Sequence, residues 1–156
     1  MLNLFVKSVI FSVIVPGVVA ILIPILIAEE KVTENIFFFL SGSFLLACGL
    51  VIYSWCVWDF VSFGKGTPAP IAAPKHLVVR GLYHYSRNPM YVGVLLVISG
   101  WALIYSRPAI FIYGLFVIIC FQMFIVLYEE PRLYQIFGRD FKKYRAKVNR
   151  WLPDFL

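Results

Sequence analysis

Charged residues are scarce in this chain of 156 residues, since Asp, Glu, Lys and Arg together make up 14% and hydrophobic residues make up 62%. A soluble globular domain carries about a quarter charged residues and roughly half apolar ones. The composition therefore excludes an ordinary soluble protein. The sequence also lacks internal repeats and low-complexity linkers, so we expect a single integral-membrane domain over residues 1–156.

Cysteines are few and unclustered. Cys48, Cys56 and Cys120 all lie in apolar stretches, and none belongs to a Cys-x-x-Cys pair. Metal and redox sites in proteins generally require thiols at close, regular spacing. We therefore expect buried structural thiols and no metal site.

Four stretches contain no charged residue at all, at 8–28, 35–58, 88–106 and 108–128. Crossing the hydrocarbon core of a bilayer takes about 20 apolar residues in a helix, so each stretch is long enough. The first stretch is longer than the apolar part of a signal peptide and runs into Glu29-Glu30-Lys31 without a small-residue cleavage site. We predict that it is retained, which gives an all-α membrane protein with about four transmembrane helices.

The positive charges are unevenly distributed. Eleven of the 14 Lys and Arg residues lie between residues 61 and 87 or after residue 130, whereas residues 29–34 are net acidic. The positive-inside rule then places the long loop, the tail and both termini in the cytoplasm. Anionic lipid headgroups or an anionic small molecule explain these charges better than nucleic acid does, because no basic fold stands apart from the membrane.

The third and fourth stretches are joined by a connection of only two or three residues around Arg107, which predicts an antiparallel hairpin. At 1.5 Å per residue each arm spans about 30 Å, so the start of one arm and the end of the other lie at the same face. Asn88 and Tyr91 are thereby predicted to lie level with Glu129 and Glu130 at a cytoplasmic mouth.

The start of the third stretch has helix-initiating residues. Asn88 is a favourable N-cap, and Pro89 suits the first helical position because its missing N–H needs no partner there. The free amides of this first turn also favour an anionic ligand group. Arg87 has the alternative role of anchoring the helix to lipid phosphates.

Glu129 and Glu130 are costly where they stand. A carboxylate at the edge of a span is poorly solvated, and the helix macrodipole disfavours negative charge in a last turn. Such a residue is tolerated when a positive group is held against it. We expect Glu130 to be solvated ahead of Pro131, and Asp59 to be a simple membrane-interface residue.

Two further segments flank this mouth. Glycines and prolines make residues 64–70 irregular, either as a flexible loop or as a rigid cytoplasmic strap, and 77–83 is a short strand-like or surface segment. After Pro131 one amphipathic helix is predicted to lie in the headgroup region, and Gly138 to allow close approach of the loop. Its apolar stripe comprises Leu133, Phe137, Phe141, Tyr144 and Val148.

Several short motifs occur in a fixed order. They are Leu-Val-Val-Arg-Gly-Leu-Tyr at 77–83, Arg-Asn-Pro-Met-Tyr-Val-Gly at 87–93, Glu-Glu-Pro-Arg-Leu at 129–133 and Phe-Gly at 137–138. Together they resemble the isoprenylcysteine carboxyl methyltransferase family, in particular its bacterial members, and more widely the integral-membrane methyltransferases that include phospholipid N-methyltransferases. The resemblance covers residues 64–153, which we take as the methyltransferase core. For a bacterial member it implies the inner membrane, with the active site facing the cytoplasm.

The resemblance implies S-adenosylmethionine as cofactor, bound from the cytosol between the last hairpin and the C-terminal segment. Its sulfonium or ammonium group would then be the positive partner of Glu129. Tyr83 and Tyr91 would present rings or hydroxyls to the cofactor, and the amides after Asn88 would hold its carboxylate. The cofactor contacts implied in this way are Lys75, His76, Leu77, Val78, Tyr83, Asn88, Pro89, Met90, Tyr91 and Glu129.

One departure from the family concerns the acceptor. Members that methylate prenylcysteine carry an arginine one turn before the first glutamate, where this chain has Ile125. A lipidic or amphipathic acceptor bearing a carboxylate, thiol or amine remains expected, without an identified catalytic base. The alternatives are a phospholipid N-methyltransferase, an NADPH-dependent membrane reductase and a non-enzymatic membrane scaffold. The sequence leaves the oligomeric state open.

Overall fold

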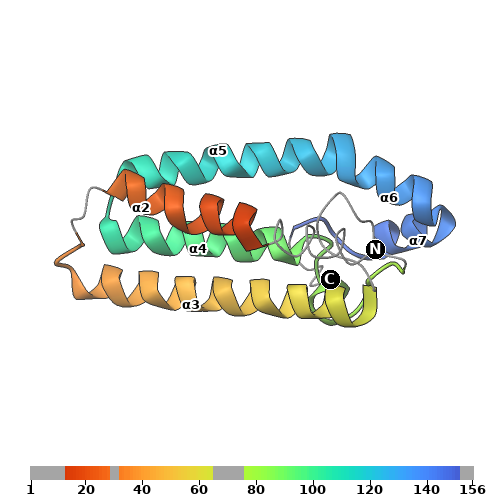
Figure 1. The fold of residues 1–156 in the computed structure, drawn as a ribbon, viewed down its shortest axis with the longest axis horizontal. Helices are drawn as coiled ribbons and strands as arrows, with labels where there is room; N and C mark the ends of the chain where they lie inside the picture. Colours follow the sequence, from red (N-terminus) through yellow and green to blue (C-terminus); the bar gives the residue numbers. More distant parts are fainter. Residues whose placement is uncertain (1–12, 29–31, 65–75, 152–156) are drawn as a thin grey trace.

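The computed structural model describes residues 13–28, 32–64 and 76–151, and no β-strand occurs among them. Figure 1 shows long helices lying side by side, with shorter ones gathered at one end. A first apolar helix, Val13–Ala28, contains the π-helical turn η1 (Val18–Leu22) and ends as α2 (Ile23–Ala28). The remaining elements are α3 (Ile36–Asp59), the π turn η2 (Phe60–Gly64), the 3₁₀ turn η3 (Gly81–His84), α4 (Pro89–Tyr105), α5 (Pro108–Phe124), the π turn η4 (Ile125–Glu129), α6 (Glu130–Phe137) and α7 (Arg139–Lys147).

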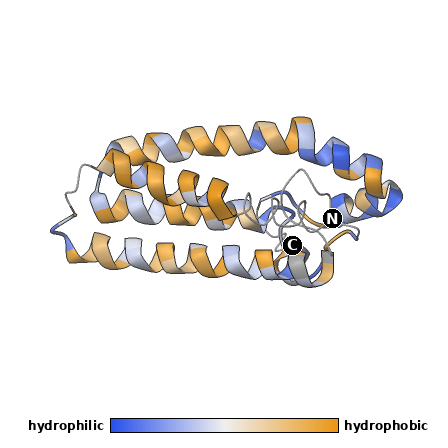
Figure 2. Cartoon of the chain, viewed as in Figure 1, coloured by the Kyte–Doolittle hydropathy of each residue, from blue (hydrophilic) through white to orange (hydrophobic). Residues whose placement is uncertain are grey.

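Each of the four predicted apolar stretches contains a helix in the described residues. Ile36–Asp59 and the continuous helix Pro108–Phe137 are long and apolar enough to cross a bilayer, and Val13–Ala28 and Pro89–Tyr105 are shorter apolar helices. Large apolar side chains cover the outside of this bundle, for example Trp58 and Ile112, whereas hydrophilic residues gather around α6 and α7 (Figure 2). Such an exterior is suited to lipid rather than water, which confirms the predicted all-α membrane protein.

Glycines bring α3 and α4 into close contact. A methyl group on Gly49 would lie 2.6 Å from the carbonyl oxygen of Gly93, and one on Gly42 would lie 2.7 Å from that of Gly100. The pairs run in opposite order along the two helices, so the helices are antiparallel, as Figure 1 shows. Small residues let helix backbones approach closely where lipid provides no hydrophobic driving force for association.

The predicted hairpin of α4 and α5 is confirmed. Ser106 adopts a left-handed conformation with φ of 47°, and Pro108 begins α5 at once. The helix that starts with α5 continues through η4 into α6, so its far part passes the beginning of α4 (Figure 1). Between the helices lies a core of small and branched apolar side chains that includes Val97, Ile98 and Ile110.

The C-terminal region differs from the prediction. Two helices replace the single amphipathic one, because Gly138 has a φ of +50° and ends α6 before α7 begins. Among the described residues no atom lies within 4 Å of a Cβ built on Gly138, so the observed role of this glycine is the turn, and the loop predicted to approach it lies almost entirely outside those residues. The apolar stripe is buried inside the protein, where Phe141, Tyr144 and Val148 pack against Leu77, Leu133 and Phe137. Protein rather than lipid therefore covers the stripe, and the placement of these helices in the headgroup region stays a prediction.

The segment before α4 is also more buried than predicted. The strand-like alternative for 77–83 is wrong, since the segment contains η3 and lies against the end of α3. Val78 and Tyr83 join a buried cluster there with Cys56. The expectation of buried thiols holds for Cys56 but is wrong for Cys120, which is exposed, and Cys48 is partly buried. Residues 65–70 of the predicted strap and the predicted cofactor residue Lys75 lie outside the described residues.

Candidate functional site

Tyr91 and Glu129 meet where the arms of the hairpin converge. Tyr91 lies in the first turn of α4 and Glu129 at the end of η4, and the Tyr91 hydroxyl donates a hydrogen bond of 2.9 Å to Glu129 Oε2. The Tyr91 ring also packs on Phe121, with centroids 4.6 Å apart. The ion pairs among the described residues do not include Glu129. A poorly solvated carboxylate held by one hydroxyl retains the capacity to accept a cationic group.

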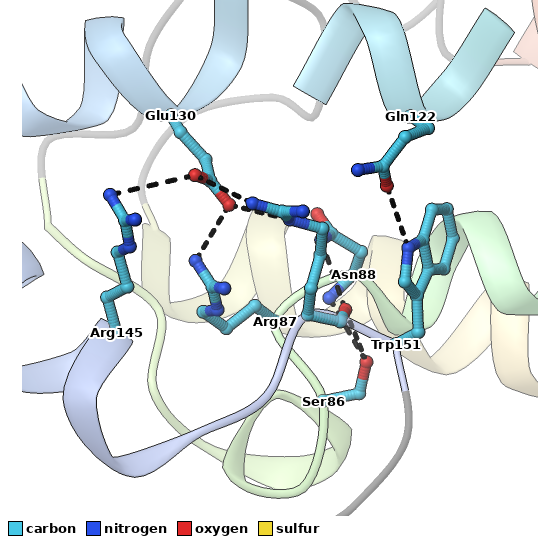
Figure 3. Close-up of polar contacts among 8 residues, drawn as sticks. Ser86, Arg87, Asn88, Gln122, Glu130, Arg145 and Trp151 are labelled. Atoms are coloured by element: carbon cyan, nitrogen blue, oxygen red, sulfur yellow. Dashed lines mark hydrogen bonds and ion pairs between the residues drawn. The ribbon is translucent and has the colours of Figure 1, made fainter. Parts of the chain in front are cut away.

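Glu130 is buried, with 8% of its surface exposed, although it was predicted to be solvated. Its Oε1 lies 2.8 Å from Arg87 Nη1 and 2.9 Å from Arg150 Nε, and Arg150 Nη2 donates to Oε2 at 3.2 Å. The exposed side chain of Arg145 approaches Oε2 at 3.9 Å. Figure 3 shows Arg87 and Arg145 directed at this carboxylate. Glu130 therefore pairs with three arginines at the point where the hairpin arms converge. Removing one partner from a buried ion pair leaves an uncompensated charge.

The two adjacent glutamates face different partners, since neighbouring residues of a helix point about 100° apart, and the helix also changes its winding here. Residues 125–129 form a π turn, and the Glu130 N–H donates to the carbonyl of Ile125, five residues earlier. Pro131 has no N–H and cannot continue the α-helical pattern of hydrogen bonds at that point. A π turn inserts an extra residue and re-aims side chains, and such turns are frequent at functional sites.

Arg87 and Asn88 do not have the local roles that the sequence predicted. The Arg87 guanidinium points at Glu130 rather than at lipid phosphates, and burial lowers its pKa, an effect that the Glu130 carboxylate opposes. Asn88 makes no side-chain capping bond to its own helix. Its amide instead donates to the Arg150 carbonyl oxygen at 3.1 Å, because the C-terminal residues occupy the space beside it. Pro89 does occupy the first helical position, as predicted.

The last described residues, Asn149–Trp151, cross this mouth, and we call them the C-terminal segment. The Arg87 N–H donates to the Asn149 carbonyl at 2.9 Å, and the Ser86 hydroxyl donates to that of Arg150 at 3.2 Å. On the other side the Trp151 indole N–H donates to Gln122 Oε1 of α5 at 3.0 Å. The segment is thus bonded both to the start of α4 and to α5 (Figure 3).

The remaining predicted cofactor residues divide between the interior and an outer groove. Val78, Met90 and the buried Tyr83 belong to the cluster around Cys56; the Tyr83 ring lies 5.4 Å from that of Phe60. The Tyr83 carbonyl accepts a 2.6 Å hydrogen bond from the Tyr144 hydroxyl, and burial raises the pKa of Tyr83. His76 and Leu77 line a groove on the outer side of Tyr144, which we call the outer groove.

Two hollows lie on either side of Tyr144. The outer groove has a volume of about 840 Å³ and carries basic side chains next to apolar ones. The inner cavity has only about 20 Å³. The groove is lined by His76, Leu77, Val79, His84, Phe137, Asp140, Lys143, Tyr144, Lys147 and Val148. The inner cavity is lined by Arg87, Asn88, Ile125, Glu129, Glu130, Leu133, Phe141 and Tyr144.

Asp59 was treated as an interface residue, but only 2% of its surface is exposed. Its Oδ1 lies 3.6 Å from Arg80 Nε, and the Arg80 guanidinium stacks 3.4 Å above the centroid of the Phe63 ring. Gly81 adopts a φ of +57°, and a Cβ on it would collide with Asp59 Oδ2. The one sequence feature that could have pointed to a buried role for Asp59 is its position directly after the charge-free stretch 35–58. For Arg150 and the C-terminal segment the sequence offered no comparable signal.

The comparisons with known proteins bear on this arrangement. A model of the phospholipid methyltransferase family matches residues 37–140, which include α3, the α4–α5 hairpin and both glutamates. The chain is also 30% identical, over 63 residues, to an uncharacterized protein of Haemophilus influenzae; those residues are 40% of this chain and all of that protein. No solved structure matches the chain.

The matched region is the one that carries the ordered motifs, so the predicted family relationship is confirmed. The family model spans about two thirds of the chain and includes both arms of the site. This chain therefore belongs to the phospholipid methyltransferase family and is a membrane methyltransferase.

Proposed function

We propose that the protein transfers a methyl group from S-adenosylmethionine to the polar group of a lipidic acceptor at the Tyr91–Glu129 pair. The observation that carries this proposal is the Glu129 carboxylate, which Tyr91 holds at 2.9 Å and which has no cationic partner among the described residues. S-adenosylmethionine bears a sulfonium and an ammonium group. Either group suits a carboxylate of this kind, because a charge-assisted interaction is strong where water is scarce.

The inner cavity alone is too small for S-adenosylmethionine, so the cofactor would have to use the outer groove as well. His76 and Leu77 line the outer groove, Asn88 and Glu129 line the inner cavity, and Tyr144 belongs to both walls. The groove has a volume typical of small-molecule sites. A ligand that uses both hollows would contact four of the residues that the family motifs implied.

S-adenosylmethionine supplies an activated methyl group whose carbon–sulfur bond breaks as the acceptor's lone pair forms the new bond to carbon. The bonding electrons pass to sulfur, which leaves as a neutral thioether. The protein's task in such a displacement is to hold the two reactants in line and to exclude water. Glu129 would orient the donor, and the apolar exterior of the bundle would admit the acceptor from the membrane.

Among acceptors, a lipid amine is better supported than a carboxylate. Ile125, which replaces the arginine of the prenylcysteine methyltransferases, is 1% exposed and lines the inner cavity next to Glu129. Arg87 lines the same cavity but is paired with Glu130. A carboxylate acceptor would therefore meet Glu129 without a compensating cation, whereas a lipid amine meets no such repulsion. The amine arrives as an ammonium, so it must release one proton to water before its nitrogen lone pair attacks the methyl carbon.

The proposal is tested by binding measurements on the purified protein in detergent. Calorimetry with S-adenosylmethionine should show binding that Glu129→Gln weakens at least tenfold, roughly the effect of removing one charge-assisted contact. Glu34→Gln is the matched control, since Glu34 is exposed at the opposite end of α3 and should leave the affinity unchanged. An unchanged affinity in Glu129→Gln would show that Glu129 does not contact the cofactor.

The same titration with NADPH separates the other candidates. A membrane reductase would bind NADPH in place of S-adenosylmethionine, and a scaffold would bind neither. Binding of NADPH alone would overturn the proposed cofactor, whereas a methyltransferase should show no saturable NADPH binding.

A further inference from the structure

The inner cavity is closed in a way that has consequences for ligand exchange. Its volume of about 20 Å³ has room for roughly one water molecule. Small-molecule sites measure several hundred Å³. A ligand that reaches Glu129 must therefore displace something that now fills the mouth.

The C-terminal segment lies beside this cavity and is bonded to residues of its wall. Three residues of the cavity wall are bonded to it: Arg87 through its N–H, Asn88 through its side-chain amide, and Glu130 through its carboxylate. These bonds go to Asn149 and Arg150, and Trp151 reaches Gln122 beyond them. The segment thus ties the start of α4 to the helix that carries both glutamates.

The attachments of the segment differ in character from those of the helix before it. Helix α7 is held by an apolar cluster in which Phe141 is 2% exposed and Tyr144 is 7% exposed. The C-terminal segment is held by hydrogen bonds and by the ion pair to Glu130, and the Arg150 side chain remains 25% exposed. Polar contacts at a partly hydrated edge exchange readily with water, whereas a packed apolar cluster does not.

We propose that the C-terminal segment is a gate over the Glu129 cavity and that the Glu130–Arg150 ion pair holds it shut. Opening would require Arg150 to leave Glu130 while Arg87 stays paired with that carboxylate, so Glu130 keeps a partner in both states. The inference rests on the proposed function, since it takes S-adenosylmethionine as the ligand that enters at Glu129.

A gate has a kinetic signature that a binding contact lacks. If Arg150 only holds the segment shut over the empty cavity, weakening it raises the open fraction and with it the association rate constant, while the dissociation rate constant stays the same and the dissociation constant falls. If Arg150 touched the cofactor, its loss would raise the dissociation rate constant alone. The two roles are therefore separable by measuring both rate constants.

The experiment is stopped-flow binding of S-adenosylmethionine to the full-length protein in detergent. Arg150→Gln should raise the association rate constant about tenfold and lower the dissociation constant by a similar factor, while the dissociation rate constant stays unchanged. Trp151→Phe keeps an aromatic ring but removes the indole donor to Gln122, and should raise the association rate constant by a smaller factor. Arg139→Gln is the matched control, because Arg139 is exposed on α7 and should leave both rate constants unchanged.

Each outcome is decisive. Two results would overturn the gate while leaving the proposed function intact. One is that the rate constants are unchanged in both Arg150→Gln and Trp151→Phe, and the other is that only the dissociation rate constant rises. Trp151→Phe keeps this test available if Arg150→Gln does not fold. Absence of binding to the unaltered protein would overturn the proposed function and the gate with it.

Discussion

The Tyr91 hydroxyl and the Glu129 carboxylate are hydrogen bonded at 2.9 Å although 38 positions separate them in the chain. Tyr91 lies at the start of α4 and Glu129 at the end of η4, so this bond joins the two arms of the hairpin where they converge. It also fixes one face of the carboxylate and leaves the other available. The position of Glu129 is thereby set before any ligand arrives, which lowers the cost of orienting it on binding.

Replacing Tyr91 by Phe should weaken S-adenosylmethionine binding roughly tenfold. The ring remains against Phe121, but the hydrogen bond that orients Glu129 is lost, and bonds to a charged group contribute about 1.5–3 kcal/mol. Calorimetry measures the affinity directly. Tyr134→Phe removes the same atom from a residue that is 55% exposed on α6 and should have no effect. An equal response of the two variants would count against the orienting role.

The adjacent glutamates should respond unequally to loss of charge when the free energy of unfolding is measured. Glu130→Gln leaves the paired arginines without their carboxylate and should lower the free energy of unfolding by about 3 kcal/mol. Glu129→Gln keeps an acceptor for the Tyr91 hydroxyl and removes a poorly solvated charge, so its effect should lie within about 1 kcal/mol of zero. Unfolding in mixed micelles provides the comparison. A similar loss in both variants would contradict the separate environments described above.

The close packing of α3 on α4 predicts that Gly49→Ala is destabilising. The added methyl would lie 2.6 Å from the Gly93 carbonyl oxygen, and overpacking of this kind costs about 1–3 kcal/mol. Gly17→Ala is the matched control, because no atom of the described residues lies within 4 Å of the added methyl. Thermal unfolding should show a lower midpoint for Gly49→Ala only. Equal midpoints would mean that the two helices separate without cost.

Two glycines with positive φ provide a further comparison. Gly81→Ala combines a strained backbone with a collision against the buried Asp59, whereas Gly138→Ala has the strain alone. Backbone strain of this kind costs about 1–2 kcal/mol per residue, and the collision adds to it. Gly81→Ala should therefore lower the free energy of unfolding more than Gly138→Ala does. The reverse order would show that Asp59 is free to move away.

The main architecture was predictable because it depends on length and charge alone. Charge-free stretches of about 20 residues defined the helices, and a connection around Arg107 too short for any other geometry defined the hairpin. From these two facts the proximity of Tyr91 to Glu129 followed without knowledge of side-chain contacts. The family relationship was likewise predictable, from ordered motifs that the family model then covered.

What sequence analysis missed depends on contacts between distant segments. Asn88 has the local sequence of an N-cap, but its amide is taken by a carbonyl 62 positions away. Glu130 and Asp59 looked like solvated residues because their cations, Arg150 and Arg80, reach them only in the folded chain. The apolar stripe of the C-terminal helices indicated a buried face, and only packing shows that protein rather than lipid covers it.

The central claim is that Glu129 serves methyl transfer, and the most direct measurement uses the protein reconstituted in liposomes that contain an amine-bearing phospholipid. With methyl-labelled S-adenosylmethionine outside, label should enter the lipid fraction. Glu129→Gln should reduce that incorporation at least tenfold, on the order of one lost charge-assisted contact, while Glu34→Gln leaves it unchanged. No incorporation by the unaltered protein, or equal incorporation by Glu129→Gln, would contradict the account.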